Sequence, residues 1–449
     1  AQGSTVSGEQ AYLQAGRDVT LRGSNVVSTE KTVVLADNDI TLEAATDTHS
    51  ERHDKTVKKS GLFSGGGIAV TVGTQQQSVE DLTTRTTVAA STVGSTQGDV
   101  LMVAGKDYRQ VGSHVMAPKG DVDVSAERID ILEARNLVQR EHETLFKQTG
   151  LSITITNPVL TAIQTAQQMK SASDKTEDGR MQVLAGATTA LAANNAATAV
   201  AQSPGSLGGV NISLSIGAQQ SRSESTQHTD TSASSTVAAG GNVSLLASGA
   251  GADSDITVRG SQIKAGNNAL LDAEGDIHLL AATDKATQES DSRGSSASVG
   301  IGFAFGGAQN GFTLNLGVAG NRGEADGEDI THTNTRVDAG NLLLLRSGGD
   351  TDIKGAVASG KQVVADIGGD LNIESLQDTS TYTVDEKSMS AGVSLCIPPF
   401  CWGVSTAGGS LGAGVTDIDS KYASVTEQSG IRAGDGGFDI RVGGNTDLV

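Results

Sequence analysis

Residues 15–24 read AGRDVTLRGS, and residues 37–47 read DNDITLEAATD. In both stretches Gly or Asp precedes a short run in which apolar and polar side chains alternate. The aspartates Asp18 and Asp39 define a period of 39 − 18 = 21 residues. An alternation of period two is typical of β-strands, and Gly and Asp favour turns. The two stretches therefore predict two similar β-coils of about 20 residues that stack on each other.

This pair of stretches recurs along the chain. The first line returns as AGKDYRQVGS (104–113), GADSDITVRGS (251–261) and SGGDTDIKGA (347–356), and the second as ERIDILEARN (127–136), EGDIHLLAATD (274–284) and GGDLNIESLQD (368–378). A β-sandwich is the alternative all-β architecture, but it does not repeat one motif at a fixed period. The repeats therefore predict an all-β solenoid.

The repeats predict one continuous region over residues 1–449. Pairs of stacked coils, which we also call rung pairs, lie near 10–47, 88–136, 237–284, 337–378 and 431–449. Inserts lie between them, near 48–87, 137–236, 285–336 and 379–430. Each insert opens with a polar run, such as THSERHDKTVKKS (48–60), and continues with a Gly-punctuated alternating stretch. The longest insert also predicts two short helices, at 158–170 and 185–202, from its helix-favouring composition.

Composition and charge exclude several functional classes. The net charge of −20 disfavours a nucleic-acid partner, because such partners require clustered Lys and Arg. No apolar run approaches the length of a transmembrane helix, and the chain begins at Ala1 without a leader, so we expect an excised piece of a longer protein. No catalytic motif, metal-ligand set or cofactor motif is recognisable. Asp recurs at predicted turns rather than in one cluster, so we predict no enzyme activity.

The AGxDVxLxGS and GDIxLxAAxD lines resemble the repeats of filamentous haemagglutinin-type exoproteins, over essentially the whole chain. Repeat pairs interrupted by Ser/Thr-rich inserts are most similar to the second haemagglutinin-repeat region of CdiA-type contact-dependent growth inhibition proteins. The resemblance implies a right-handed parallel β-helix with inserted β-hairpins, secreted by a Gram-negative bacterium through a cognate outer-membrane two-partner-secretion transporter. It also implies cell-surface, outer-membrane-associated localisation and a C-terminal toxin domain in the full-length protein.

The third insert shows the clearest hairpin. Apolar residues alternate with small or polar ones on both sides of a turn-like GGAQNG segment, at Val299, Ile301, Phe303, Phe305, Phe312, Leu314, Leu316 and Val318. Two interpretations are open. The apolar faces dock on the solenoid or extend its sheets, or the strands, which approach the length of membrane-spanning β-strands, contact a target-cell outer membrane.

The two cysteines, Cys396 and Cys401, lie in the loop of the fourth insert. Their spacing and the implied export predict a disulfide, and no further Cys or His is near enough for a zinc site. Phe400 and Trp402 flank the loop and form a candidate membrane- or partner-contact tip, with packing against the hairpin stem as the alternative.

The repeats, together with what the resemblance implies, thus predict a non-catalytic filament segment that assists toxin delivery across the target-cell outer membrane in contact-dependent growth inhibition. The alternative function is the stalk of a filamentous haemagglutinin-type adhesin that binds host cells. The adhesin would bind host cells through a saturable receptor, whereas the delivery segment would act on bacterial membranes.

Overall fold

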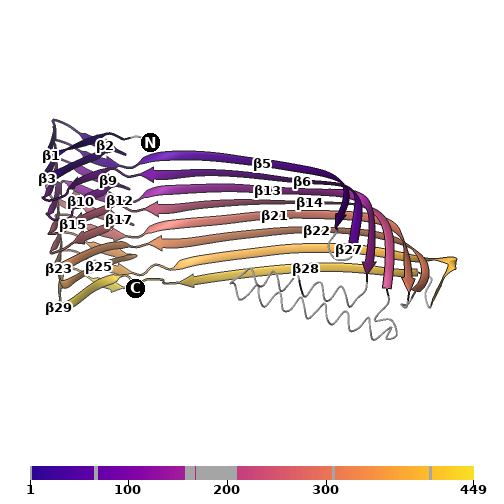
Figure 1. The fold of residues 1–449 in the computed structure, drawn as a ribbon. Coiled ribbons are helices and arrows are strands. Elements are labelled where there is room, and N and C mark those ends of the chain that lie inside the picture. The colour runs from indigo at the N-terminus through magenta and orange to yellow at the C-terminus, as the bar shows by residue number, and fades with distance from the viewer. Residues whose placement is uncertain (1–2, 65–68, 157–166, 168–209, 306–308, 404–406) are drawn as a thin grey trace.

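The computed structural model describes residues 3–64, 69–156, 167, 210–305, 309–403 and 407–449. These residues are almost entirely strand, and they form two parallel sheets and one antiparallel sheet. The parallel sheets build a stalk at the left of Figure 1, and the antiparallel sheet extends away from it. The predicted all-β class with parallel sheets is confirmed. The predicted helices at 158–170 and 185–202 lie, apart from Gln167, outside the described residues.

Sheets A and B form the stalk. Sheet A contains β1 (Thr5–Ala15), β3 (Asn25–Ala36), β7 (Thr92–Ser95), β8 (Val100–Ala104), β10 (His114–Ala117), β11 (Val122–Ala126), β15 (Thr236–Ala239), β16 (Val243–Ala247), β18 (Gln262–Ala265), β19 (Ala269–Ala273), β23 (Thr335–Ser347), β25 (Ala356–Ile367) and β29 (Gly430–Val442). Sheet B contains β2 (Val19–Arg22), β4 (Ile40–Glu43), β9 (Asp107–Val111), β12 (Arg128–Leu132), β17 (Ile256–Arg259), β20 (Ile277–Leu280), β24 (Thr351–Lys354), β26 (Leu371–Glu374) and β30 (Thr446–Leu448). A 3₁₀ turn, η2 (Gly251–Asp253), precedes β17.

The strands stack coil upon coil in the order that the repeats predict. Val19 pairs with Ile40, and Leu21 pairs with Leu42, in a parallel register. Strand β3 runs across two faces, because its first part pairs with β7 and its last part with β8. Strand β23 does the same with β18 and β19, so ten strands of sheet A form a closed ring of pairings. The handedness of the coil stays a prediction.

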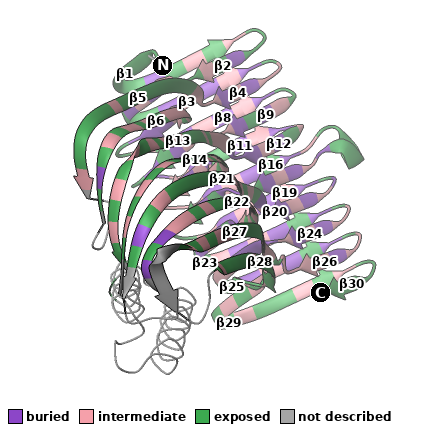
Figure 2. Cartoon of the chain, turned by 90° about the vertical axis from the view of Figure 1, so that its right-hand side faces the viewer, coloured by how far each residue is buried: buried purple, intermediate pink, exposed green. Residues whose placement is uncertain are grey.

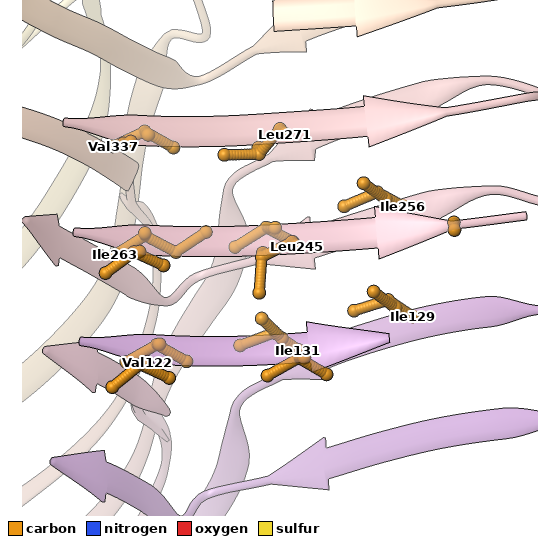
Figure 3. Close-up of a cluster of buried hydrophobic side chains, with 14 of the residues drawn as sticks. Val122, Ile129, Ile131, Leu245, Ile256, Ile263, Leu271 and Val337 are labelled. Carbon is orange, nitrogen blue, oxygen red and sulfur yellow. The ribbon is translucent and has the colours of Figure 1, made fainter. Parts of the chain in front are cut away.

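The core of the stalk is a continuous column of aliphatic side chains. Figure 3 labels buried side chains from successive coils, among them Val122, Ile131, Leu245 and Leu271. Each of these four side chains is almost completely buried. Since alternate residues of every coil point into one shared interior, the period-two pattern of the repeats becomes a core.

The Asp residues at the turns tie successive coils together. The Oδ1 atom of Asp276 accepts a hydrogen bond from the backbone N–H of Asp350 at 2.7 Å, and Asp350 does the same for Asp370 at 2.7 Å. The Gly-Ser end of the motif has a related role. Gly260 adopts a φ of 52°, and the hydroxyl of the following Ser261 accepts a hydrogen bond from the N–H of Ser235 in the neighbouring coil. These contacts assign the recurrent aspartates and serines to coil stacking.

The four inserts contribute four long hairpins, and together they form sheet C, which we call the hairpin sheet. Its strands are β5 (Ala45–Ser64), β6 (Ala69–Ala89), β13 (Ala134–Thr156), β14 (Val210–Ala233), β21 (Ala282–Phe305), β22 (Gln309–Thr333), β27 (Asp378–Gly403) and β28 (Ala407–Ser424). Neighbouring hairpins pair with each other through β6–β13, β14–β21 and β22–β27. The described strands of the inserts therefore neither dock their apolar faces on the stalk nor extend its parallel sheets, which corrects that interpretation of the sequence.

The spacing of the hairpins explains why they join into one sheet. Each hairpin follows two strands of sheet B, such as β17 and β20 before β21, so two coils separate one hairpin from the next. Two coils advance the stalk by about 9.6 Å, at about 4.8 Å per strand. A two-stranded hairpin occupies the same width. The stalk and the hairpin sheet therefore grow in step, and each hairpin emerges beside the previous one.

Candidate contact face of the hairpin sheet

Large apolar side chains form parallel rows across one face of the hairpin sheet, at the end away from the stalk. The pairing registers join them into three rows that we call the distal apolar face. The rows are Leu62, Val72, Leu151, Ile216, Val299, Leu316 and Val393; then Val70, Ile153, Leu214, Ile301, Leu314 and Leu395; then Ile155, Ile212, Phe303 and Phe312. All of them except the partly buried Leu314 are exposed.

Such a face is unusual for a chain surrounded by water. Contiguous exposed apolar patches mark surfaces that bind another protein or a membrane, whereas single exposed apolar residues need no explanation. Figure 2 shows the contrast, since buried residues recur along the stalk while the hairpin sheet is mostly exposed or intermediate. The distal apolar face is therefore the strongest candidate functional surface among the described residues.

The residues that the sequence singled out in the third insert lie in the middle of this face. Val299, Ile301 and Leu316 have exposed fractions of 42%, 51% and 44%, and Val318 is one row nearer the stalk. Phe303 and Phe312 are opposite each other, with ring centroids 5.3 Å apart in an edge-to-face arrangement. The side chains of Phe305, Phe400 and Trp402 lie outside the described residues.

The opposite face of the same strands carries small and polar residues. A transverse line of Gly61, Gly73, Gly150 and Gly217 crosses four strands in register. A Cβ atom on Gly73 would lie 2.1 Å from the carbonyl oxygen of Thr149, so this position accepts only glycine without a backbone shift. The strands bend near their distal ends in Figure 1. Glycine without a side chain permits such close approach and bending.

The two cysteines face the same neighbouring strand. On β22, Thr313 pairs with Cys396 and Gly311 pairs with Cys401, and the four intervening residues of β27 are accommodated at a register shift. Two positions along one strand are about 6.6 Å apart, which is within the Cα separation of natural disulfides. The backbone register supports the predicted disulfide, which stays a prediction because the side chain of Cys401 lies outside the described residues.

A charged network fixes the base of the hairpin sheet to the stalk, and sequence reasoning missed it. Arg135 donates to Asp230 at 2.7 Å and to the carbonyl oxygen of Thr283 at 2.8 Å, so it joins β13, β14 and β21. The stalk residue Arg259 donates to the nearly buried carboxylate of Glu133 at 3.0 Å. Hydrogen-bonded and partly desolvated pairs of this kind fix geometry more strongly than exposed ones.

A second anchor lies at the fourth hairpin. Asp378 accepts hydrogen bonds from the backbone N–H of His332 at 2.8 Å and from the hydroxyl of Thr426. Burial disfavours the charged carboxylate, but these hydrogen bonds from Thr426 and His332 outweigh it and hold the pKa of Asp378 below its usual value. The anchor therefore favours ionised Asp378.

The described part of the chain contains no group of three or more His, Cys, Asp or Glu side chains arranged to hold a metal ion. Within the same residues, no helix combines the length and apolar character needed to cross a membrane.

The repeat motif, the stacked coils and the inserted hairpins define a class of protein that the comparison with known families identifies. The "Hemagglutinin repeat" family matches residues 1–139 and 216–391, and the chain belongs to this family. No solved structure matches the chain.

Within this family the chain is similar to CdiA proteins. It is 35% identical to a "tRNA nuclease CdiA" of Escherichia coli strain NC101 and 34% identical to a "Deoxyribonuclease CdiA" of Dickeya dadantii. The first alignment covers 99% of this chain and 14% of the relative, and the second covers 100% and 13%. A "16S rRNA endonuclease CdiA" of Enterobacter cloacae is 36% identical over 100% of this chain and 13% of its own length. The chain thus spans about one seventh of these relatives.

Proposed function

We propose that this chain is a non-catalytic filament segment of a secreted contact-dependent growth inhibition exoprotein. In this proposal the stalk is a right-handed parallel β-helix, and the segment corresponds to the second haemagglutinin-repeat region. The full-length protein carries a C-terminal toxin, leaves the cell through a cognate two-partner-secretion transporter and stays at the surface of a Gram-negative bacterium, associated with the outer membrane.

The printed activities of the relatives support a non-catalytic role. Similar segments occur in proteins named for cleavage of tRNA, of DNA and of 16S rRNA. The three relatives match this chain at about the same identity over nearly its whole length, so the shared segment does not account for their three different activities. We therefore assign the nuclease activities to other parts of those proteins, and a supporting role to the segment that they share with this chain.

The distal apolar face is the single observation that carries the proposed role. The hairpin sheet extends away from the stalk in Figure 1, so its distal end lies far from the stalk. The distal apolar face lies at that end. We propose that the face contacts the outer membrane of the target cell and assists delivery of the toxin. Transfer of an exposed Val, Ile, Leu or Phe side chain from water to an apolar phase is favourable by about 1.5–3 kcal/mol of free energy.

Vesicle flotation with the full chain tests this proposal. We expect the chain to float with vesicles of outer-membrane lipids, and we expect vesicles to protect the distal ends of the hairpins from protease. The double variant Ile301→Ser, Leu316→Ser removes two side chains of the distal apolar face and should weaken binding by roughly 100-fold.

The matched control is Met116→Ser, Leu246→Ser, because both residues are exposed apolar side chains on the stalk. It should leave flotation unchanged. Failure of the unaltered chain to bind any vesicle would overturn the proposed role, as would equal loss of binding in the two double variants.

A further inference from the structure

Every strand of the hairpin sheet contributes one carboxylate to a single register row. The first four strands supply Asp54, Glu80, Glu143 and Glu224. The last four supply Asp291, Glu324, Asp385 and Asp417. The row lies on the same face as the distal apolar face, because the two are separated by an even number of residues on each strand. We call it the carboxylate row.

Cations lie on the same face, between the carboxylate row and the distal apolar face. Two residues nearer the distal end, Arg222, Arg293, Arg322 and Lys387 form a second register row on four adjacent strands. Two residues further, Lys58 and Lys147 both pair with Gln76 in a third row. All six side chains are exposed. We call these six residues the basic band.

Part of the basic band is already neutralised within the sheet. Arg222 contacts Glu143 at 2.8 Å, and Lys387 contacts Asp385 at 2.9 Å. Arg322 pairs with Glu324. In contrast, Lys58, Lys147 and Arg293 form no ion pair with any described residue, so three cations remain available to an external anion.

The order of these zones matches the order of layers at a lipid surface. One further row, which contains the exposed Val318 and Leu411, continues the apolar zone toward the stalk. The basic band begins two residues, about 7 Å, beyond that row. Lipid phosphates lie just outside the hydrocarbon layer, within an interfacial region several ångströms thick. Lys and Arg pair with phosphate there, whereas carboxylates are costly to transfer out of water.

We propose that the hairpin sheet docks on a phosphate-bearing anionic lipid surface, with the basic band at the headgroup phosphates and the carboxylate row limiting the depth of entry. This inference rests on the proposed membrane contact and adds the chemistry of the surface and the position where contact stops. The net charge of −20 does not prevent docking, since charges further than about 8 Å are largely screened at physiological salt.

Flotation with two lipid compositions tests the basic band. The full chain is mixed with vesicles of phosphatidylethanolamine alone and with vesicles that also contain phosphatidylglycerol. Affinity should be higher for the anionic vesicles. The triple variant Lys58→Gln, Lys147→Gln, Arg293→Gln should lose on the order of 100-fold in affinity for them.

The matched control is Arg17→Gln, Lys264→Gln, Lys361→Gln, which removes the same charge from exposed positions of the stalk. It should bind as the unaltered chain does. Equal binding of the unaltered chain to both kinds of vesicle, or an equal loss of affinity in both triple variants, overturns the proposed role of the basic band. Neither result affects the proposed membrane contact. Absence of binding to both compositions overturns the proposed membrane contact itself.

The carboxylate row is tested by the depth of protection. Hydrogen exchange should show amide protection added by anionic vesicles from the distal end up to the basic band, and exchange that the vesicles leave unchanged beyond the carboxylate row. The variant Asp291→Asn, Glu324→Gln, Asp417→Asn should move this boundary toward the stalk. An unmoved boundary, with binding intact, rejects the depth limit.

Discussion

The stalk and the hairpin sheet use the same alternating pattern and reach opposite results. In the stalk, alternate strand positions such as Val124, Leu245 and Leu271 are buried, because each coil closes around a common interior. In the hairpin sheet, Val299 and Ile301 alternate in the same way and are exposed, because the sheet is a single layer. The difference shows that a period-two pattern specifies a strand and its faces, but that burial depends on whether a second surface covers the apolar face.

Truncation of matched apolar residues gives the largest expected contrast between the two regions. Leu271→Ala in the stalk should lower the free energy of unfolding by about 2–5 kcal/mol, because it leaves a cavity in a completely buried site. Leu316→Ala on the distal apolar face should change it by less than about 0.5 kcal/mol. Urea denaturation followed by circular dichroism measures both. Similar losses in the two variants would show that the distal apolar face is covered in solution.

The junction between the regions gives the next effect. Arg135→Ala removes hydrogen bonds from β13 to β14 and β21 and should destabilise the base of the hairpin sheet by about 1.5–3 kcal/mol. Hydrogen exchange should accelerate at the bases of these strands. The control Arg52→Ala removes an exposed pair and should cost at most about 1 kcal/mol. If stalk and hairpin amides were to respond equally to Arg135→Ala, the anchor would not be local.

Acid should loosen the fourth hairpin before it affects the stalk core. Since the pKa of Asp378 is lower in the folded chain than in the unfolded chain, its contribution is complete above about pH 4 and is lost as the pH falls through the folded value. Exchange at the base of β27 should therefore rise below about pH 4. In Asp378→Asn this pH dependence should disappear, with about 1 kcal/mol lost at neutral pH. A rise that persists in the variant would point to another group.

The smallest effect is expected from the carboxylate row. Asp291 lies between Glu224 and Glu324 in register, and like charges directly opposite each other destabilise a sheet. Asp291→Asn should therefore stabilise the hairpin sheet by a few tenths of a kcal/mol, and the gain should shrink at high salt. Slower exchange in β21 at low salt is the readout. Destabilisation would mean that Asp291 accepts a contact that outweighs the repulsion.

Local patterns in the sequence predicted the strands but not the assembly of the hairpin sheet. The alternating pattern of Val19 and Leu21, with an Asp such as Asp39 at the preceding turn, recurs at a fixed period. The stacked parallel strands could therefore be derived from this pattern. The pairing of β14 with β21 has no local signal, because it depends on the equal widths of two coils and one hairpin. The spacing of the carboxylates gives one signal for the carboxylate row. Asp54, Glu143 and Asp291 each lie nine residues after the first residue of their strand.

The central claim is that separate inserts form one sheet in a fixed register, and engineered disulfides test it most directly. Thr226 on β14 and Glu289 on β21 belong to different hairpins and are register partners. The pair Thr226→Cys, Glu289→Cys should form a disulfide readily under mild oxidation, because directly opposite Cβ atoms are about 4.5–5.5 Å apart. The pair Thr226→Cys, Arg293→Cys, displaced by four residues, should not form one. Equal cross-linking of both pairs, or none in the first, would contradict the hairpin sheet.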